Sequence, residues 1–145
     1  MSRLSPVLLA VGNPDEVPVL HQAFRETNTT NPLHVVHNGE RTIQYLAGQE
    51  EFADRSLFLF PALLLLDLKM PMRGGLEVLR WLSEHPQISQ KLPVVVLSSA
   101  ELVDETQQAY AMAIQACIVT PLAYSDLRER IRILKDYWLD YESQA

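Results

Sequence analysis

The chain has 145 residues, of which 48% are hydrophobic and 21% are charged, and this balance suits one globular domain with its own core. Eighteen Asp and Glu residues against twelve Lys and Arg give a formal charge of -6, which argues against a nucleic-acid partner because no basic field is present. One cysteine, no secretory signal and no apolar run near the roughly 18 residues of a membrane span favour a reduced, cytoplasmic setting without a membrane partner.

Short apolar runs alternate with segments of helical spacing along the chain. The runs are nearly unbroken, as strands are when both of their faces are covered, and they span 7–11, 33–36, 62–66, 94–97 and 116–119. Helices are expected from Val17 to Phe24, over 40–46, from Val78 to Leu82, over 103–112 and from Leu127 to Trp138. Asp15 is expected to cap the first helix, which places Pro18 at its third position.

This alternation predicts an α/β fold, with a doubly wound parallel sheet and helices on both faces. We expect a single domain over residues 1–145, with a slightly extended C-terminal helix. Ligands of such sheets bind beyond the carboxyl ends of the strands. Functional residues are therefore expected in the segments that follow the strands, around Gly12, Asp67, Ser98 and Thr120.

Several segments resemble the receiver domain of response regulators. The strongest is Leu65-Leu66-Asp67-Leu68-Lys69-Met70-Pro71 with Gly74-Gly75, in which an Asp closes a buried strand. Leu8 to Asp15, Pro93 to Ser98 and Thr120-Pro121 agree with the same family, so the resemblance covers essentially the whole chain. The segment from Ile133 to Leu139, and the long connection before Ala62, are similar to the single-domain regulators associated with bacterial phytochromes. The resemblance implies a flavodoxin-like sheet with strand order 2-1-3-4-5 and a cis peptide at Pro121.

The resemblance also implies a role for individual residues. In a working receiver, an acidic pair after the first strand and the Asp of the third strand hold Mg²⁺, while a lysine of the fifth strand pairs with the phosphoryl group. Asp67 holds the phosphoacceptor position and Ser98 the position of the switch hydroxyl. The acidic pair, the lysine and the aromatic partner of the switch hydroxyl align with degenerate positions, namely Val11, Gly12, Thr120 and Ile118.

These replacements predict a weak phosphorylation site. Mg²⁺ prefers hard oxygen ligands, and the acidic-pair positions supply none, so we expect no metal and no cofactor. Mg²⁺ binding is expected only if Asp15 or Glu16 turns inward as a surrogate ligand, and Lys69 or Arg73 are the candidates to replace the missing cation. No catalytic residue and no enzymatic activity are expected, because the segment after Asp67 lacks the second acid of an aspartyl phosphatase.

Other polar residues favour structural roles. Ser98 and Ser99 are expected to satisfy backbone groups at the strand end. The four histidines show no ligand spacing, and Cys117 is expected in the core.

Three functions are compatible with the sequence. The leading hypothesis is a degenerate single-domain response regulator that acts as a signalling adaptor through protein contacts, with a histidine kinase or a phytochrome-type sensor as the partner. The alternatives are a functional receiver that is phosphorylated on Asp67, and a small-ligand-binding or structural module that uses the strand-end pocket. A homodimer is expected because the last helix is apolar on two sides, although ordinary half-exposed tyrosines explain that pattern equally well. The interface candidates are Tyr110, Ile133, Tyr137 and Trp138.

Overall fold

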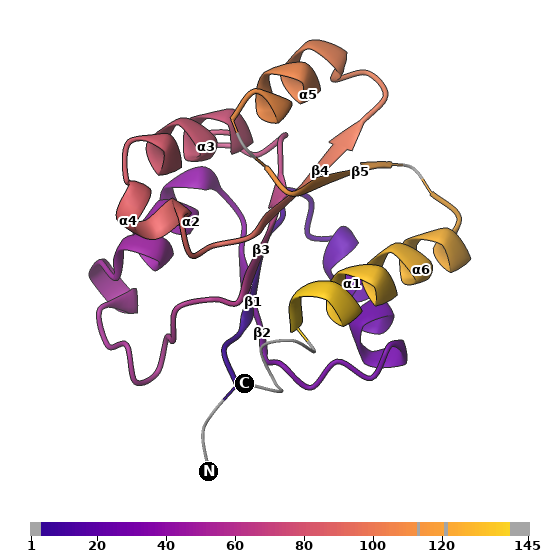
Figure 1. The fold of residues 1–145 in the computed structure, drawn as a ribbon, viewed down its shortest axis with the longest axis horizontal. Coiled ribbons are helices and arrows are strands. Elements are labelled where there is room, and N and C mark those ends of the chain that lie inside the picture. The colour runs from indigo at the N-terminus through magenta and orange to yellow at the C-terminus, as the bar shows by residue number, and fades with distance from the viewer. Residues whose placement is uncertain (1–3, 113, 121, 140–145) are drawn as a thin grey trace.

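The computed structural model describes residues 4–112, 114–120 and 122–139, which form a five-stranded sheet between two layers of helices (Figure 1). All strand pairs are parallel and the order is β2-β1-β3-β4-β5, which confirms the predicted fold. The strands are β1 (Val7–Ala10), β2 (Leu33–Val36), β3 (Leu63–Asp67), β4 (Val94–Ser99) and β5 (Ala116–Thr120).

The helices are divided between the two faces of the sheet (Figure 1). One face carries α1 (Glu16–Glu26) and α6 (Tyr124–Leu134), which continues as the π-helical turn η2 (Lys135–Leu139). The other face carries α2 (Gly39–Ala47), the 3-10 turn η1 (Glu50–Phe52), α3 (Gly75–Ser83), the short helix α4 (Pro86–Ser89) and α5 (Val103–Tyr110). None of the described helices is long and apolar enough to cross a membrane.

Two apolar clusters, one on each face, explain why the strand sequences are almost unbroken runs. Leu8 and Ala10 of β1 point towards α2 and α3, whereas Val7 and Leu9 point towards α1 and α6. All four side chains are completely buried, because successive residues of a strand point to opposite faces and both faces are covered. The edge strand β2 is only partly buried, which accounts for its weaker sequence signal.

The long connection after α2 folds back over that helix around an aromatic cluster. The Tyr45 hydroxyl donates a hydrogen bond to the Leu59 carbonyl at 3.0 Å, and the ring lies 5.0 Å from Phe52 and 6.0 Å from Phe58. Burial raises the pKa of Tyr45 to about 12, so the hydroxyl remains a donor at neutral pH. The connection is therefore a packed part of the domain.

Two helix boundaries test the sequence reasoning directly. Asp15 precedes α1 and Pro18 takes the third helical position, as predicted, but the Asp15 side chain forms no capping hydrogen bond. Asn38 caps α2 by accepting the Arg41 backbone N–H at 2.8 Å. The predicted cis peptide at Pro121 lies outside the described residues.

Candidate functional site

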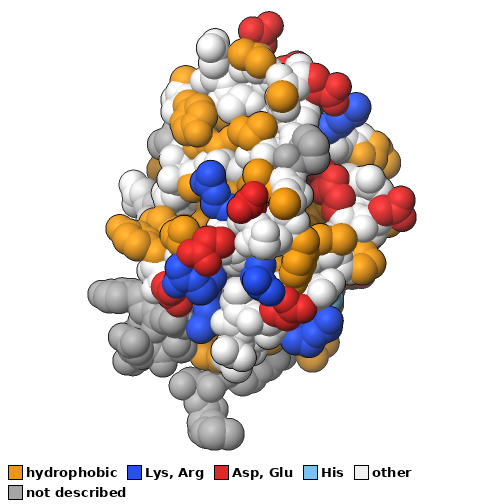
Figure 2. All heavy atoms as spheres, turned by 90° about the vertical axis from the view of Figure 1, so that its right-hand side faces the viewer, with side chains coloured by type: hydrophobic (Ala, Val, Ile, Leu, Met, Phe, Trp, Pro, Cys, Tyr) orange, Lys and Arg blue, Asp and Glu red, His pale blue; other side chains and the backbone are white. Residues whose placement is uncertain are grey.

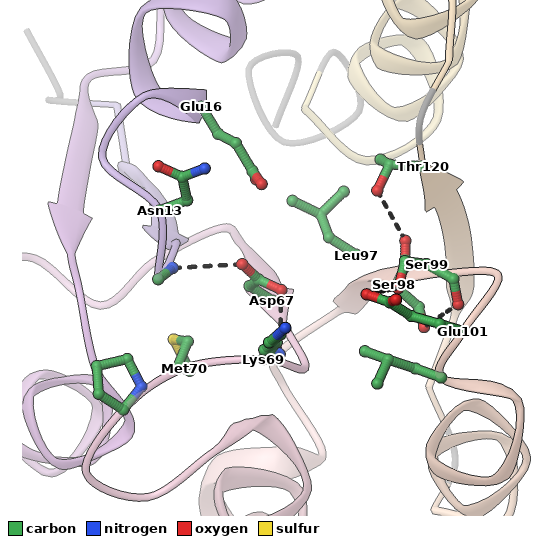
Figure 3. Close-up of a pocket in the computed structure, with 13 residues that line it drawn as sticks. Asn13, Glu16, Asp67, Lys69, Met70, Leu97, Ser98, Ser99, Glu101 and Thr120 are labelled. Carbon is green, nitrogen blue, oxygen red and sulfur yellow. Dashed lines mark hydrogen bonds between the residues drawn. The ribbon is translucent and has the colours of Figure 1, made fainter.

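A cavity of about 600 Å³ opens at the carboxyl ends of the strands, where the fold predicts a binding site (Figure 3). We call it the polar cavity. Its described lining residues are Gly12, Asn13, Glu16, Asp67, Lys69, Met70, Pro71, Leu97, Ser98, Ser99, Glu101, Leu102 and Thr120. The fold therefore brings four of the predicted positions together, those of Gly12, Asp67, Ser98 and Thr120.

The Asp67 carboxylate is held by backbone amides at the end of β3. One oxygen accepts the Gly12 N–H at 3.3 Å and the other accepts the Lys69 N–H at 3.1 Å (Figure 3). Burial raises the pKa of Asp67, and these two hydrogen bonds act in the opposite direction because they favour the charged form. Asp67 thus joins the loop after β1 to the loop after β3.

Glu16 is the surrogate candidate that turns inward. Its carboxylate reaches from the first turn of α1 towards Asp67 (Figure 3), and burial followed by the charge of Asp67 raises the pKa of Glu16. Among the described residues, no side chain or backbone group donates a hydrogen bond to this carboxylate. Asp15, the other candidate, is exposed and does not line the polar cavity.

The two positions of the acidic pair, Val11 and Gly12, supply no side-chain oxygen ligand for Mg²⁺. Val11 directly follows β1, and its side chain is completely buried in the core below α1 and α6. A Cβ atom at Gly12 would lie only 2.5 Å from the Lys69 carbonyl oxygen, so the loop after β3 closes against this position. Within the described residues, no three His, Cys, Asp or Glu side chains are placed to share a metal ion. The residues present therefore fit Mg²⁺ poorly.

The two candidates for a replacement cation differ in position. Lys69 lines the polar cavity, and its charge partly opposes the rise that burial causes in the pKa of Asp67. Arg73 instead lies beside two carboxylates of neighbouring helices, 3.6 Å from Glu40 and 3.8 Å from Glu77. Arg73 does not line the polar cavity, and its guanidinium is directed towards α2 and α3.

The hydroxyl groups of the strand ends are engaged with the protein itself. Thr106 of α5 donates its only hydroxyl hydrogen to the Leu102 carbonyl at 2.7 Å, so Ser98, 2.6 Å away, donates to Thr106. Thr120 donates to the Ser98 carbonyl at 3.0 Å. The Ser98 hydroxyl is thereby directed towards α5, which agrees with its expected structural role.

The predicted position of the aromatic partner is wrong. Ile118 pairs with Leu97 in the sheet, and both side chains lie in the core below α1 and α6. Ser98 points to the opposite face, which it shares with Cys117 because successive side chains alternate along β5. Cys117 is only half-buried, and burial raises the pKa of its thiol. The alternation of side chains along β5 is the signal that could have moved this position by one residue, from Ile118 to Cys117.

Sequence reasoning missed two residues of the site. Thr106 receives the Ser98 hydroxyl, and Glu101 accepts a hydrogen bond from Ser99 at 3.5 Å on the rim of the cavity. Neither residue belongs to a recognisable motif. The turn between β4 and α5 brings both of them to the site.

Three of the four histidines have separate structural contacts. His34 lies 2.8 Å from the Tyr45 hydroxyl, His37 lies 3.0 Å from the Val11 carbonyl, and His85 lies 2.6 Å from the Trp81 carbonyl. These contacts agree with the expected structural roles.

Three of the four interface candidates are exposed. Tyr110 of α5, Ile133 of α6 and Tyr137 of η2 have 59%, 50% and 68% of their surface accessible. Trp138 is half-buried against the core below α1 and α6, and its ring lies 4.6 Å from Tyr137. On the side of the molecule where α1 and α6 lie, apolar side chains are interspersed with charged ones (Figure 2).

Comparisons with known proteins agree on one family. A family model described as the response regulator receiver domain matches residues 7–132. The solved structure of RPA3017, a response regulator in red light signalling of R. palustris, is 33% identical with a TM-score of 0.84, over 93% of this chain and 94% of that one. The phosphorylated cyanobacterial phytochrome response regulator RcpA is 26% identical with a TM-score of 0.81, over 94% of both chains. A probable methanogenesis regulatory protein, FilR2 of Methanothrix harundinacea, is 29% identical over 93% of this chain and 84% of its own.

Proposed function

Because the chain belongs to the response regulator receiver domain family, we propose that it is a degenerate receiver that acts as a signalling adaptor through protein contacts, without efficient Mg²⁺-dependent phosphorylation. One observation carries this proposal. The Asp67 carboxylate is bound by the Gly12 and Lys69 amides, and the backbone of the loop after β3 occupies the space that a side chain at position 12 would need.

The electrostatics of the polar cavity support the same proposal. Phosphorylation would add roughly 1.5 to 2 negative charges to Asp67, close to the Glu16 carboxylate and without the lysine that Thr120 replaces. Metal stabilisation of a transferring phosphoryl group contributes on the order of several kcal/mol. Its loss slows such a reaction by orders of magnitude, because every 1.4 kcal/mol is about a factor of ten.

The partner that we propose is a histidine kinase or a phytochrome-type sensor. RPA3017 belongs to red light signalling and RcpA is a phytochrome response regulator, and both cover this chain almost completely. We further propose that the chain forms a homodimer through an exposed apolar surface, the α5–β5–α6 surface, which consists of Tyr110, Val119, Ile133 and Tyr137. Trp138 packs against the core on one side and against the ring of Tyr137 on the other.

A phosphodonor experiment tests the adaptor function. The protein is incubated with Mg²⁺ and acetyl phosphate beside a receiver that has the complete acidic pair and lysine, and intact masses are recorded. We expect the complete receiver to gain a phosphoryl group and this protein to gain none. A gain that disappears in Asp67→Asn would overturn the proposal.

One observation favours the competing function, phosphorylation of Asp67 by a histidine kinase. Glu16 faces Asp67 and is the one surrogate acid that lines the polar cavity among the two expected from the sequence. A titration with Mg²⁺ separates the two functions. The adaptor proposal predicts no saturable binding at the strand ends, whereas tight binding that is lost in Glu16→Gln would establish Glu16 as a replacement ligand.

A further inference from the structure

A second hollow adjoins the polar cavity. This apolar groove has a volume of about 360 Å³ and runs between α1, the ends of β4 and β5, and the start of α6. Its apolar lining consists of Val19, Leu20, Leu97, Leu122 and Leu127. Four residues line both hollows, namely Glu16, Leu97, Ser99 and Thr120. The polar cavity and the apolar groove are therefore two parts of one cleft.

The residue at position 120 keeps the two parts connected. Thr120 has a short side chain, and its hydroxyl turns away to the Ser98 carbonyl at 3.0 Å. In Figure 3, Glu16 and Thr120 lie on either side of Leu97, at the junction of the two hollows. A longer side chain at position 120 would enter this junction.

The charges of the polar cavity define what the cleft can bind. Among its described lining residues, Glu16, Asp67 and Glu101 carry carboxylates and Lys69 carries an ammonium group, which leaves a net charge of -2. The Glu16 carboxylate has no hydrogen-bond donor within the described part of the chain and lies close enough to Asp67 to be repelled by it. Partly buried carboxylates of this kind are stabilised by a cation that also donates hydrogen bonds.

We propose that the cleft binds a small amphipathic ammonium compound. The ammonium group, with its three N–H donors, lies between the carboxylates of Glu16 and Asp67. The alkyl part lies in the apolar groove against Val19, Leu122 and Leu127. The combined polar and apolar lining is typical of small-molecule sites, and an organic cation does not need the closely spaced oxygen ligands that Mg²⁺ requires. This site goes beyond the adaptor function and would give the domain an input other than phosphorylation.

The probes for the first test are ethylammonium, butylammonium and hexylammonium, titrated into isotope-labelled full-length protein at neutral pH and followed by NMR. We expect saturable shifts at Gly12, Ser99 and Leu122. Affinity should rise about two- to fourfold for each added methylene group, as burial of alkyl surface requires. The matching alcohols should bind at least about tenfold more weakly, since they lack the charge. A series without dependence on chain length, or alcohols that bind as well as the amines, would overturn the proposal.

Two substitutions test the head-group site. Thr120→Lys places an ammonium group of the protein at the junction, so we expect it to abolish binding of butylammonium. Thr30→Lys is the matched control, because it places the same ammonium group at an exposed threonine that lines neither hollow. Glu16→Gln should weaken binding about tenfold, the value of one charge-assisted hydrogen bond, while Glu84→Gln at the C-cap of α3 should not. Unchanged affinity in both Thr120→Lys and Glu16→Gln would refute the site.

The apolar groove has its own test. Val19→Ser should reduce the gain in affinity from butylammonium to hexylammonium, whereas Val103→Ser on α5 should leave it unchanged. Both side chains are exposed, so neither substitution opens a cavity in the core. An equal gain in all three proteins would place the alkyl chain elsewhere and overturn the proposal. The acetyl phosphate experiment does not depend on this result, so the failure of either proposal is recognised separately.

Discussion

Glu16 and Asp67 are two carboxylates that meet in a partly buried place without a described cation between them. Burial first, and then the charge of Asp67, raise the pKa of Glu16 above its ordinary value. An acid with a higher pKa in the folded than in the unfolded state destabilises the fold when it is ionised. This destabilisation is absent below the ordinary pKa of the unfolded chain and develops as the pH rises through the folded-state value.

Glu16→Gln is therefore expected to raise the free energy of unfolding at neutral pH. The gain should be less than about 1 kcal/mol, because the side chain is only partly buried and solvent screens its charge. Below about pH 3.5 the gain should vanish, because Glu16 is then protonated in both states. Urea unfolding at several pH values measures the difference, with Glu84→Gln as the control. A variant that is less stable than the natural protein at pH 7 would contradict this explanation.

Gly12 leaves no room for a side chain of the acidic pair unless the loop after β3 moves. A Cβ atom at this position approaches the Lys69 carbonyl oxygen to 2.5 Å, so the loop after β3 has to move. Gly12→Asp should lower the free energy of unfolding by about 1 to 3 kcal/mol, as overpacking does, and should not create Mg²⁺ affinity. Gly12→Ala carries the same Cβ without the charge and should lose a similar amount. If only the Asp variant is destabilised, charge repulsion rather than the close contact is responsible.

The site residues that sequence could identify are those in a continuous motif. Asp67 ends a leucine run before Met70-Pro71, and its place at the carboxyl edge of the sheet follows from the fold. Thr106 could not be found in this way, because only the path of the turn between β4 and α5 brings it next to Ser98. Ile118 was assigned to the wrong face because the alignment ignored the alternation of side chains in β5.

At the level of elements, a hydrogen bond between two hydroxyl groups connects α5 to the end of β4. Ser98 is only 3% exposed, and its hydroxyl hydrogen is accepted by Thr106 at 2.6 Å. Thr106→Val keeps the shape of the side chain but leaves the buried Ser98 hydroxyl with only a 3.5 Å contact to the Ser99 carbonyl, and this loss costs about 1 to 3 kcal/mol. We expect faster amide hydrogen exchange over 103–110, whereas Thr30→Val at an exposed position should not change it.

A double-mutant cycle tests whether this pair is the cause. When Ser98→Ala is added to Thr106→Val, neither hydroxyl remains, so the double variant should recover most of the lost stability. Simple addition of the two losses would mean that the two hydroxyl groups stabilise α5 independently.

The C-terminal helix departs from its predicted stripe for a geometric reason. The spacing of Leu127, Ile131, Leu134 and Trp138 predicts that the last of these residues continues the buried face. From Lys135 the helix has π geometry, in which the residue five positions onward takes the equivalent place. Leu139 is accordingly 1% exposed, and Trp138 turns partly outward. A stripe with a period of 3.6 residues cannot anticipate this change, whereas the long regular helices were predicted well.

At the scale of the whole molecule, four of the eight exposed large apolar side chains among the described residues belong to the α5–β5–α6 surface. The α5–β5–α6 surface contains Tyr110, Val119, Ile133 and Tyr137, each between 47% and 68% exposed. Exposed apolar groups that gather on neighbouring elements mark contact surfaces. In a two-fold symmetric dimer every residue of the surface occurs twice, so the effect of one substitution on association is doubled.

Tyr137→Asp is therefore expected to convert the proposed homodimer into a monomer. The carboxylate would face either its own symmetry copy or the apolar groups of the partner, and burying such a charge without a partner costs several kcal/mol. Light scattering coupled to size exclusion, over a series of protein concentrations, measures the mass of both proteins. Leu57→Asp is the matched control, because Leu57 is 61% exposed on the connection before β3, away from this surface. A natural protein that stays monomeric at every concentration would remove the dimer, and a dimer that persists in Tyr137→Asp would place the interface on another face.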